Sequence, residues 1–173
     1  HSHPPRRHSG YRGVQRWATA TKADQANDYS VCTTWLVRGS HAWLLDLFRA
    51  KLEYPELRKR IEIEARRHEV SEVLVEEAGS GVALVQDLKR STRLCVIGVT
   101  PRDDKETRLL AVTPQIEGGR VSLPSDAAWL AEFQREMVLF PNGKHDDQVD
   151  SVTQFLTWMD RPRFASGTIP FQL

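Results

Sequence analysis

Three aspartates near the C-terminal end of the chain have the spacing of a cation site. Asp146, Asp147 and Asp150 begin the last long apolar pattern. On a helix, Asp150 would lie beside the other two, because residues three and four positions apart are neighbours on a helix surface. Mg²⁺ and Mn²⁺ bind a few carboxylates together with water and substrate phosphate. The simpler alternative is an acidic first turn that caps a surface helix, where Asp is common.

A further acid ends an earlier apolar run. Glu76 follows the apolar residues 73–75 and precedes a glycine-rich turn at 78–81. In open α/β sheets, binding sites form at the carboxyl ends of strands, so Glu76 could meet the aspartates of the last helix. Two ions roughly 3.5–4 Å apart could then clamp the attacking water and the leaving oxygen of a phosphodiester. Glu77 is the alternative ligand, because neighbouring residues of a strand face opposite sides of the sheet.

The rest of the chain predicts an α/β fold that would bring these acids together. Strand-like runs at 14–18, 29–37 and 41–49 predict an antiparallel meander. Further strands are expected at 73–76 and 94–99. Helical patterns cover 54–68, 82–89, 105–117, 127–140 and 146–159. Strands separated by helices favour parallel pairing, so the predicted fold is a mixed sheet flanked by helices. The helix at 82–89 is expected to pack Val82, Val85 and Leu88 inward.

Composition narrows the class of protein. The 173 residues, 40% of them hydrophobic, predict one domain with a real core, and the net charge of +1 indicates no particular partner. Cys32 and Cys95 lie in apolar runs and are expected to be buried thiols in a reducing compartment. No apolar run approaches the ~18 residues of a membrane span. A Walker-type phosphate loop is absent from the sequence, so ATP hydrolysis is not expected.

Basic residues gather in two places, the stretch 49–68 and a group formed by Arg102, Lys105 and Arg108. Either could contact phosphates of a nucleic acid. Solvated helix faces are the alternative for both.

Four segments, in their order and spacing, resemble the nuclease domain of phage large terminase subunits. They are residues 15–35, 73–81, 119–124 and 145–150, and the likeness covers about 14–160. The resemblance implies a ribonuclease-H-like fold and cutting of double-stranded, concatemeric DNA during genome packaging in the host cytoplasm. It also implies Mg²⁺ or Mn²⁺ as cofactor, with two ions in an active form. Full-length members carry an ATPase motor and act with a portal protein and a small terminase subunit, so we expect this chain to be a C-terminal fragment or a chain whose motor was removed.

The first acidic motif departs from the family. Family members have Asp after the tryptophan of the first strand, where it bridges both metals, and this chain has Ala18. We expect an inactivated copy, unless the register is shifted and Asp24 or Asp28 substitutes.

The resemblance also implies a role for each remaining acid. Glu76 would hold one ion and Asp147 or Asp150 the other, with Asp146 as a ligand or a supporting group. Lys105, Arg108 and Arg102 would contact DNA. Two other classes stay open, a Holliday-junction resolvase-like nuclease and a non-enzymatic docking module.

The domain boundaries follow from the same patterns. Residues 1–13 are expected to be a poorly ordered linker or expression remnant. Residues 14–160 would form the nuclease domain, and 161–173 an irregular tail.

Overall fold

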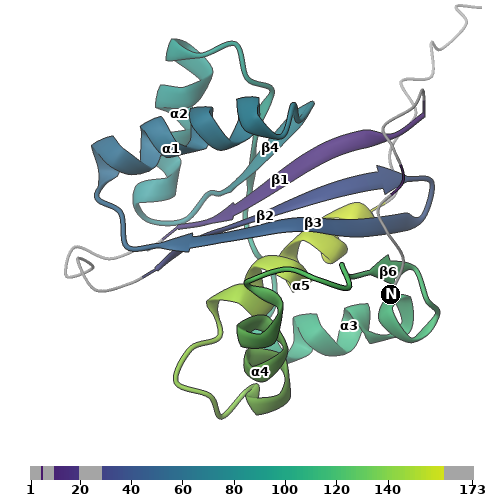
Figure 1. Ribbon diagram of the computed structural model, residues 1–173. Coiled ribbons are helices and arrows are strands. Elements are labelled where there is room, and N and C mark those ends of the chain that lie inside the picture. Colours follow the sequence, from purple (N-terminus) through teal and green to yellow (C-terminus); the bar gives the residue numbers. More distant parts are fainter. Residues whose placement is uncertain (1–4, 6–9, 20–28, 162–173) are drawn as a thin grey trace, which may run out of the picture.

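A six-stranded mixed sheet separates two layers of helices in the computed structural model, which describes residues 5, 10–19 and 29–161 (Figure 1). Helices α1 and α2 cover one face of the sheet, and α3, α4 and α5 lie on the other. The order of the strands is β5-β4-β1-β2-β3-β6. The predicted combination of an antiparallel meander with parallel strands is therefore confirmed.

The first three strands form the meander, and the later strands add to its two edges. They are β1 (Arg12–Ala18), β2 (Ser30–Arg38), β3 (His41–Ala50), β4 (Glu72–Glu76), β5 (Val96–Val99) and β6 (Val121–Ser122). β4 pairs in parallel with β1, β5 with β4, and β6 with β3. β1 begins two residues earlier than expected, because its pairing with β2 extends to Arg12 and Val37.

The five helices bury their apolar faces in two cores. They are α1 (Tyr54–Arg67), α2 (Ser80–Ser91), α3 (Lys105–Glu117), α4 (Leu130–Leu139) and α5 (Asp147–Met159). Trp17 belongs to the core under α1 and α2. Trp35 lies in the other core and stacks on Phe155 of α5, with ring centroids 4.3 Å apart. Because β-strand side chains alternate between faces, each strand of the meander contributes to both cores.

The inward face of α2 differs from the prediction. The helix begins at Ser80 and buries Gly81, Leu84, Val85 and Leu88, whereas Val82 is 41% exposed. Gly81 fixes this face, because a Cβ there would lie 1.9 Å from the carbonyl oxygen of Glu76. The helix can pack so closely on the end of β4 only with glycine at this position.

The prediction that both thiols are buried was right for Cys32 and wrong for Cys95. Cys32 lies inside β2, whereas Cys95 is exposed. β5 begins only at Val96, so Cys95 lies in the connection before the strand rather than within it.

None of the described helices is both long enough and apolar enough to cross a bilayer. Most of the expected N-terminal segment, and residues 162–173 of the expected tail, lie outside the described residues.

Candidate metal centre

The carboxyl ends of β1 and β4 meet beneath the start of α5. Trp17 pairs with Val75 in parallel register, so Ala18 and Glu76 are the next residues along the two strands. Trp17 and Val75 face the α1/α2 core. Strand alternation therefore turns Ala18 and Glu76 toward α5. Ala18, where the resemblance implies an aspartate, and Glu76 thus share one edge and one face of the sheet.

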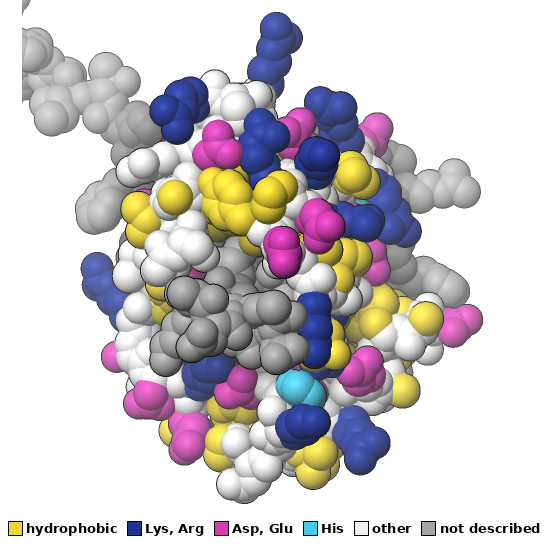
Figure 2. Space-filling model, turned by 90° about the vertical axis from the view of Figure 1, so that its left-hand side faces the viewer, with side chains coloured by type: hydrophobic (Ala, Val, Ile, Leu, Met, Phe, Trp, Pro, Cys, Tyr) yellow, Lys and Arg dark blue, Asp and Glu magenta, His cyan; other side chains and the backbone are white. Residues whose placement is uncertain are grey.

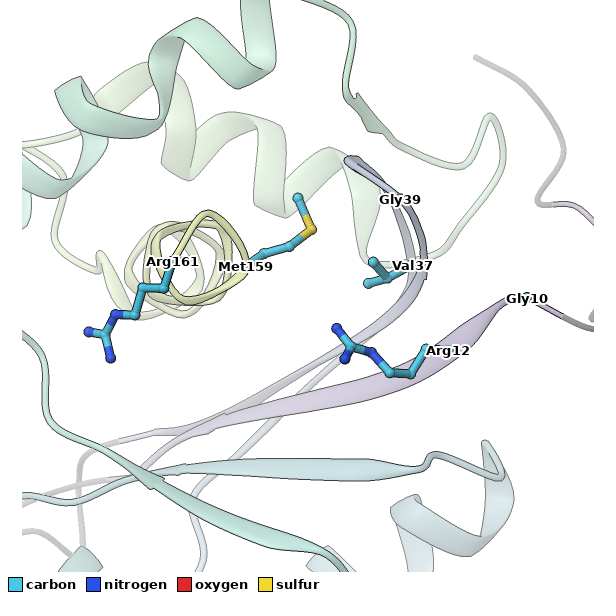
Figure 3. A pocket seen from close by; sticks show the side chains of 6 residues that line it. All are labelled: Gly10, Arg12, Val37, Gly39, Met159 and Arg161. Carbon is cyan, nitrogen blue, oxygen red and sulfur yellow. The ribbon is translucent and has the colours of Figure 1, made fainter. Parts of the chain in front are cut away.

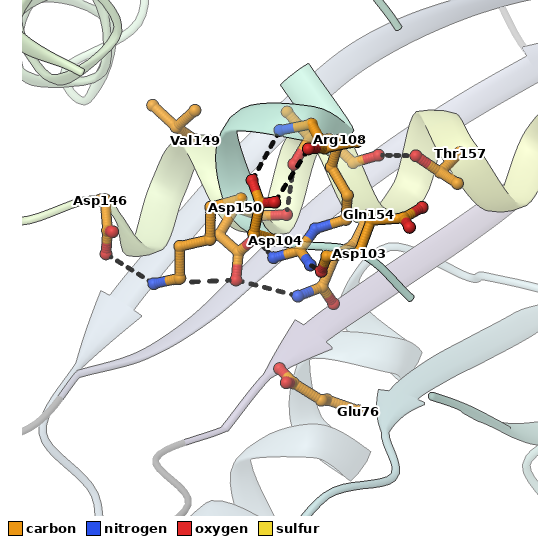
Figure 4. Close-up of polar contacts among 12 residues, drawn as sticks. Glu76, Asp103, Asp104, Arg108, Asp146, Val149, Asp150, Gln154 and Thr157 are labelled. Carbon is orange, nitrogen blue, oxygen red and sulfur yellow. Dashed lines mark hydrogen bonds and ion pairs between the residues drawn. The ribbon is translucent and has the colours of Figure 1, made fainter. Parts of the chain in front are cut away.

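The first turn of α5 brings further carboxylates to this edge. Asp150 is 8% exposed and accepts hydrogen bonds from Nη2 of Arg108 and, at 2.9 Å, from Nε2 of Gln154. The ammonium of Lys105 lies 2.8 Å from Oδ1 of Asp146 and 4.0 Å from Oδ2 of Asp150. Figure 4 shows Glu76, at the end of β4, facing the α5 residues Asp150 and Gln154.

The pKa of Glu76 reflects the charges around it. Burial raises the pKa of Glu76, the positive charge of Arg16 opposes that shift, and the negative charge of Asp150 adds to it. A carboxylate that is desolvated and repelled by a second carboxylate is stabilised by a cation between them. The convergence of strand end and helix start that the nuclease hypothesis requires is thus present in the fold.

Asp147 lies in a different environment. Burial raises the pKa of Asp147, and the charge of Asp146 raises it further, while Lys105 lowers it. Glu136 and Arg49 are its other charged neighbours, and Glu76 is not among them. Asp147 therefore lies on the side of the site toward α4 and β3, and its role as a ligand stays a prediction.

The first turn of α5 is capped from another helix. Oε1 of Glu136, on α4, accepts hydrogen bonds from the backbone amides of Gln148 (2.7 Å) and Val149 (2.9 Å), and its Oε2 accepts one from Nε2 of Gln148 (2.6 Å). Asp146 stands at the N-cap position without a side-chain capping bond. Glu136 thus satisfies two of the amides that a helix start leaves open, so capping of these amides does not account for the aspartates.

A buried cation beside Glu76 was missed in the sequence. Arg16 is fully buried, donates from Nη1 to the carbonyl of Trp17 at 2.6 Å, and places Nη2 4.0 Å from Oε2 of Glu76. Burial lowers its pKa to about 10, so the guanidinium stays charged at neutral pH. The sequence did carry a signal, because two polar residues in succession, Gln15 and Arg16, lie in the middle of the predicted strand between Val14 and Trp17. Because Arg16 and Ala18 share a face, this cation lies next to the methyl group of Ala18.

The basic residues expected at DNA are placed unevenly. Arg108 is 7% exposed and donates to the carbonyl oxygens of Arg102 and Asp103 as well as to Asp150. Lys105 is bound to Asp146. Only Arg102 is exposed. DNA contact by these three residues stays a prediction, and two of them are engaged with the acids of the site.

Glu77, the alternative to Glu76 as a ligand, faces away from α5. The carboxylate of Glu77 packs over Gly98 of β5, where an added Cβ would lie 2.6 Å from Oε2 of Glu77. Glu76 is thus the acid on the α5 side. His145 is exposed and contacts Tyr29 edge-on, with ring centroids 5.6 Å apart. Asp24 and Asp28, the possible substitutes for the missing aspartate, lie outside the described residues.

A large cavity lies at the opposite end of the sheet and is unrelated to these acids. It has a volume of about 520 Å³ and is lined by Arg12, Val37, Met159 and Arg161, together with two glycines (Figure 3). Arg12 there pairs with Glu72 and lies over the ring of Trp158. Converging carboxylates, rather than cavity size, mark the candidate site.

The family model of the terminase RNaseH-like domain matches residues 17–157 of this chain. The match spans both strand ends and the whole first turn of α5. The chain therefore belongs to this family, a class of nuclease domains of terminases. Comparison with curated proteins gives no match.

Solved terminase structures share the fold. The large terminase nuclease from thermophilic phage G20c with bound magnesium has a TM-score of 0.67 at 16% identity, over 87% of this chain and 82% of that chain. The human cytomegalovirus terminase nuclease domain, soaked with manganese and bound to an inhibitor, has a TM-score of 0.56 at 12% identity, over 90% and 86% of the two chains.

A longer relative has the same fold in one part. The large terminase from a second thermophilic bacteriophage, in complex with ADP, has a TM-score of 0.66 at 13% identity, and the match covers 89% of this chain but 40% of that one. At these identities the likeness shows a common fold and no more.

Proposed function

We propose that this chain is the nuclease module of a viral DNA-packaging terminase, with a site shaped for hydrolysing phosphodiester bonds in double-stranded, concatemeric DNA. The observation that carries the proposal is the meeting of position 18, Glu76 and Asp150 on one face of the sheet, at the carboxyl ends of β1 and β4. This is where binding sites form in open α/β sheets.

The donor atoms around Glu76 fit a hard divalent cation. The side chains of Glu76, Asp150 and Asp146 offer only carboxylate oxygens, and one of them is held at a raised pKa by burial. Such oxygens suit Mg²⁺ or Mn²⁺. Two bound ions would lower the pKa of the attacking water and neutralise charge on the leaving oxygen. Arg108 holds Oδ1 of Asp150, and Gln154 donates to its Oδ2, so the carboxylate is fixed in orientation within the site.

The methyl group of Ala18 leaves this donor set one carboxylate short. A methyl group cannot bind a cation, and the aspartate that the family carries here would bridge both ions. We therefore propose that this chain binds divalent ions weakly and cuts DNA poorly or not at all. The buried positive charge of Arg16 lies 4.0 Å from Glu76 and partly offsets its negative charge.

The proposed partners follow from the longer relative. That large terminase is in complex with ADP, and the match covers 40% of its length. We propose that the present chain is likewise joined to an ATPase motor in its full-length protein and acts with a portal protein and a small terminase subunit in the cytoplasm of the infected host.

Restoring the carboxylate tests this proposal. In Ala18→Asp, cleavage of supercoiled plasmid DNA in Mn²⁺ or Mg²⁺ is expected to rise at least about a hundredfold above the unmodified chain, since a metal site contributes several kcal/mol to such a reaction. Gel electrophoresis of nicked and linear products measures it. Ala18→Asn, which matches the size without the charge, is the control and should stay inactive. An Ala18→Asp protein that is inert in both metals would contradict the proposal.

A docking module without catalytic activity is the second candidate. It is favoured by Ala18 and by the basic side chains of Arg16, Lys105 and Arg108, which lie beside the acids. Under that reading Ala18→Asp gains no cleavage. Calorimetry with Mn²⁺ would then show equally weak binding to both proteins, whereas the nuclease proposal expects clearly tighter binding by Ala18→Asp.

A further inference from the structure

A basic groove lies beside the acids, between the end of β3 and the segment that joins α4 to α5. Its volume is about 250 Å³, and its charged lining consists of Arg49, Arg135 and Lys144 together with Glu132 and Glu136; His145 lies at its edge toward the acids. The backbone connects it directly to the candidate metal centre, because Asp146 follows His145. Figure 2 looks onto this end of the molecule, where Lys and Arg side chains are interspersed with acidic ones.

An aromatic ring organises the cations at the groove. The guanidinium of Arg49 lies 3.8 Å from the centroid of the Tyr29 ring, and the ammonium of Lys51 lies 5.0 Å from it. His145 approaches the same ring edge-on. Cation–π contacts of this kind hold basic side chains in place without neutralising them.

Most of these charges have no acidic counterpart. Arg49 pairs with Glu132, whose side chain is 66% exposed. Glu136 is occupied by the amides of α5. Within the described residues, Lys51, Arg135 and Lys144 form no ion pair, and all three are exposed. Three positive side chains line the groove against two glutamates, and Lys51 on the neighbouring Tyr29 ring adds a further positive charge. The net charge at the groove is therefore positive, and its unpaired cations contrast with Lys105 and Arg108, which are bound to Asp146 and Asp150.

The register of the sheet sets the distance between groove and metal centre. Ala18 pairs with Val31, and Val31 pairs with Arg49, so the three lie in one row across β1, β2 and β3. Neighbouring strands are about 4.8 Å apart, which puts the backbone of Arg49 roughly 10 Å from that of Ala18. Measured along the axis of a duplex, this distance corresponds to about three base-pair steps, at ~3.4 Å each.

We infer that the basic groove binds the phosphate backbone of double-stranded DNA a few nucleotides from the bond at the metal centre. The inference rests on the proposed function and adds where the substrate lies. Phosphate contacts position a duplex without reading its sequence. The groove would thus fix the direction in which DNA crosses the site, from the acids toward β3 and α4.

The salt dependence of DNA binding tests this inference. The double substitution Lys51→Gln/Lys144→Gln is compared with Lys59→Gln/Lys89→Gln, which removes equal charge from exposed positions on α1 and α2, across the sheet. Fluorescence anisotropy with a labelled duplex in Mg²⁺ measures affinity at several salt concentrations. The groove variant is expected to bind about tenfold more weakly, with a salt slope smaller by about two. The control variant should match the unmodified chain.

The outcomes separate the two claims. If the groove variant and the control variant bind DNA equally well, the inference that the groove binds DNA is wrong, and the nuclease proposal is unaffected. If the unmodified chain does not bind the duplex even at low salt, both the inference about the groove and the nuclease proposal are contradicted. Lys51→Arg/Lys144→Arg should retain the slope, and calorimetry should show unchanged Mn²⁺ binding by the groove variant; loss of either would indicate a structural effect instead and overturn the inference.

Discussion

Two clusters of acids lie on opposite faces of the same sheet, and they differ in how their charge is balanced. Asp46, Glu64 and His68 meet on the α1 side, with one ligand atom of each within 4.8 Å of the others. On the α5 side, Glu76 meets Asp150. By composition, the first cluster is the more obvious metal site, because it includes a histidine.

The charge environments indicate the reverse. A hydrogen bond with His68, whose Nε2 lies 3.0 Å from Oδ2 of Asp46, lowers the pKa of Asp46. Arg60 and Arg67 lie within 4 Å of the carboxylate of buried Glu64. These acids are compensated by the chain itself. On the α5 side, Asp150 is likewise paired, with Arg108, but burial raises the pKa of Glu76 despite the nearby Arg16. Proximity of acids is thus a weak indicator of a cation site, and incomplete compensation is a better one.

The largest expected effect is on DNA cleavage, which should depend on the acids of the α5 side and not on those of the α1 side. In the Ala18→Asp background, Glu76→Ala should reduce plasmid cleavage roughly a thousandfold, since several kcal/mol depend on the metal. Glu64→Gln in the same background should cut at close to the parent rate, measured under identical Mn²⁺ conditions. If the two substitutions reduced cleavage equally, the distinction between the clusters would be wrong.

A smaller effect concerns the cation that holds Asp150. Arg108→Gln leaves a buried carboxylate without its closest positive charge, and the free energy of unfolding should fall by about 3 kcal/mol in EDTA. Urea denaturation measures this, and added Mn²⁺ should recover part of the loss. Arg102→Gln, at an exposed position, should change stability by less than ~0.5 kcal/mol. Similar losses from both substitutions would argue against a buried Arg108–Asp150 pair.

The smallest effect appears in the pH dependence of the compensated cluster. Because the folded state lowers the pKa of Asp46 from its ordinary 3.8, its carboxylate stabilises the fold above that value, and this contribution is lost as the pH falls through the lower, folded pKa. Asp46→Asn should cost about 1 kcal/mol at neutral pH, the typical contribution of one hydrogen bond, and little at the acid end. Urea denaturation at a series of pH values measures the difference, and a cost that is constant with pH would contradict the assignment.

Much of the fold could be predicted from local patterns. The β-branched runs of β2 and the apolar stripe of α5 follow from side-chain alternation and helical spacing. Errors arose where a contact from another element decided the outcome. The inward face of α2 was mispredicted because Gly81 packs on the carbonyl of Glu76. Cys95 was mispredicted because β5 begins at Val96, two residues later than expected.

The candidate site divides in the same way. The acids Glu76, Asp146 and Asp150, and the alanine at position 18, stand out from residue type and order alone. Arg16 and Glu136 did not, because a buried arginine and a cap supplied by a different helix have no local pattern. Each contacts a residue far away in the sequence. Arg16 lies 4.0 Å from Glu76, and Glu136 lies 2.7 Å from the backbone amide of Gln148 on another helix.

The sequence by itself determined the strands and helices, the family resemblance and the absence of a carboxylate at position 18. Only the tertiary structure decided which acids face one another, which cations neutralise them and which basic residues remain exposed beside the site. The physical reason is that element type follows from local side-chain periodicity, whereas electrostatic balance depends on burial and on charges brought together from distant parts of the chain.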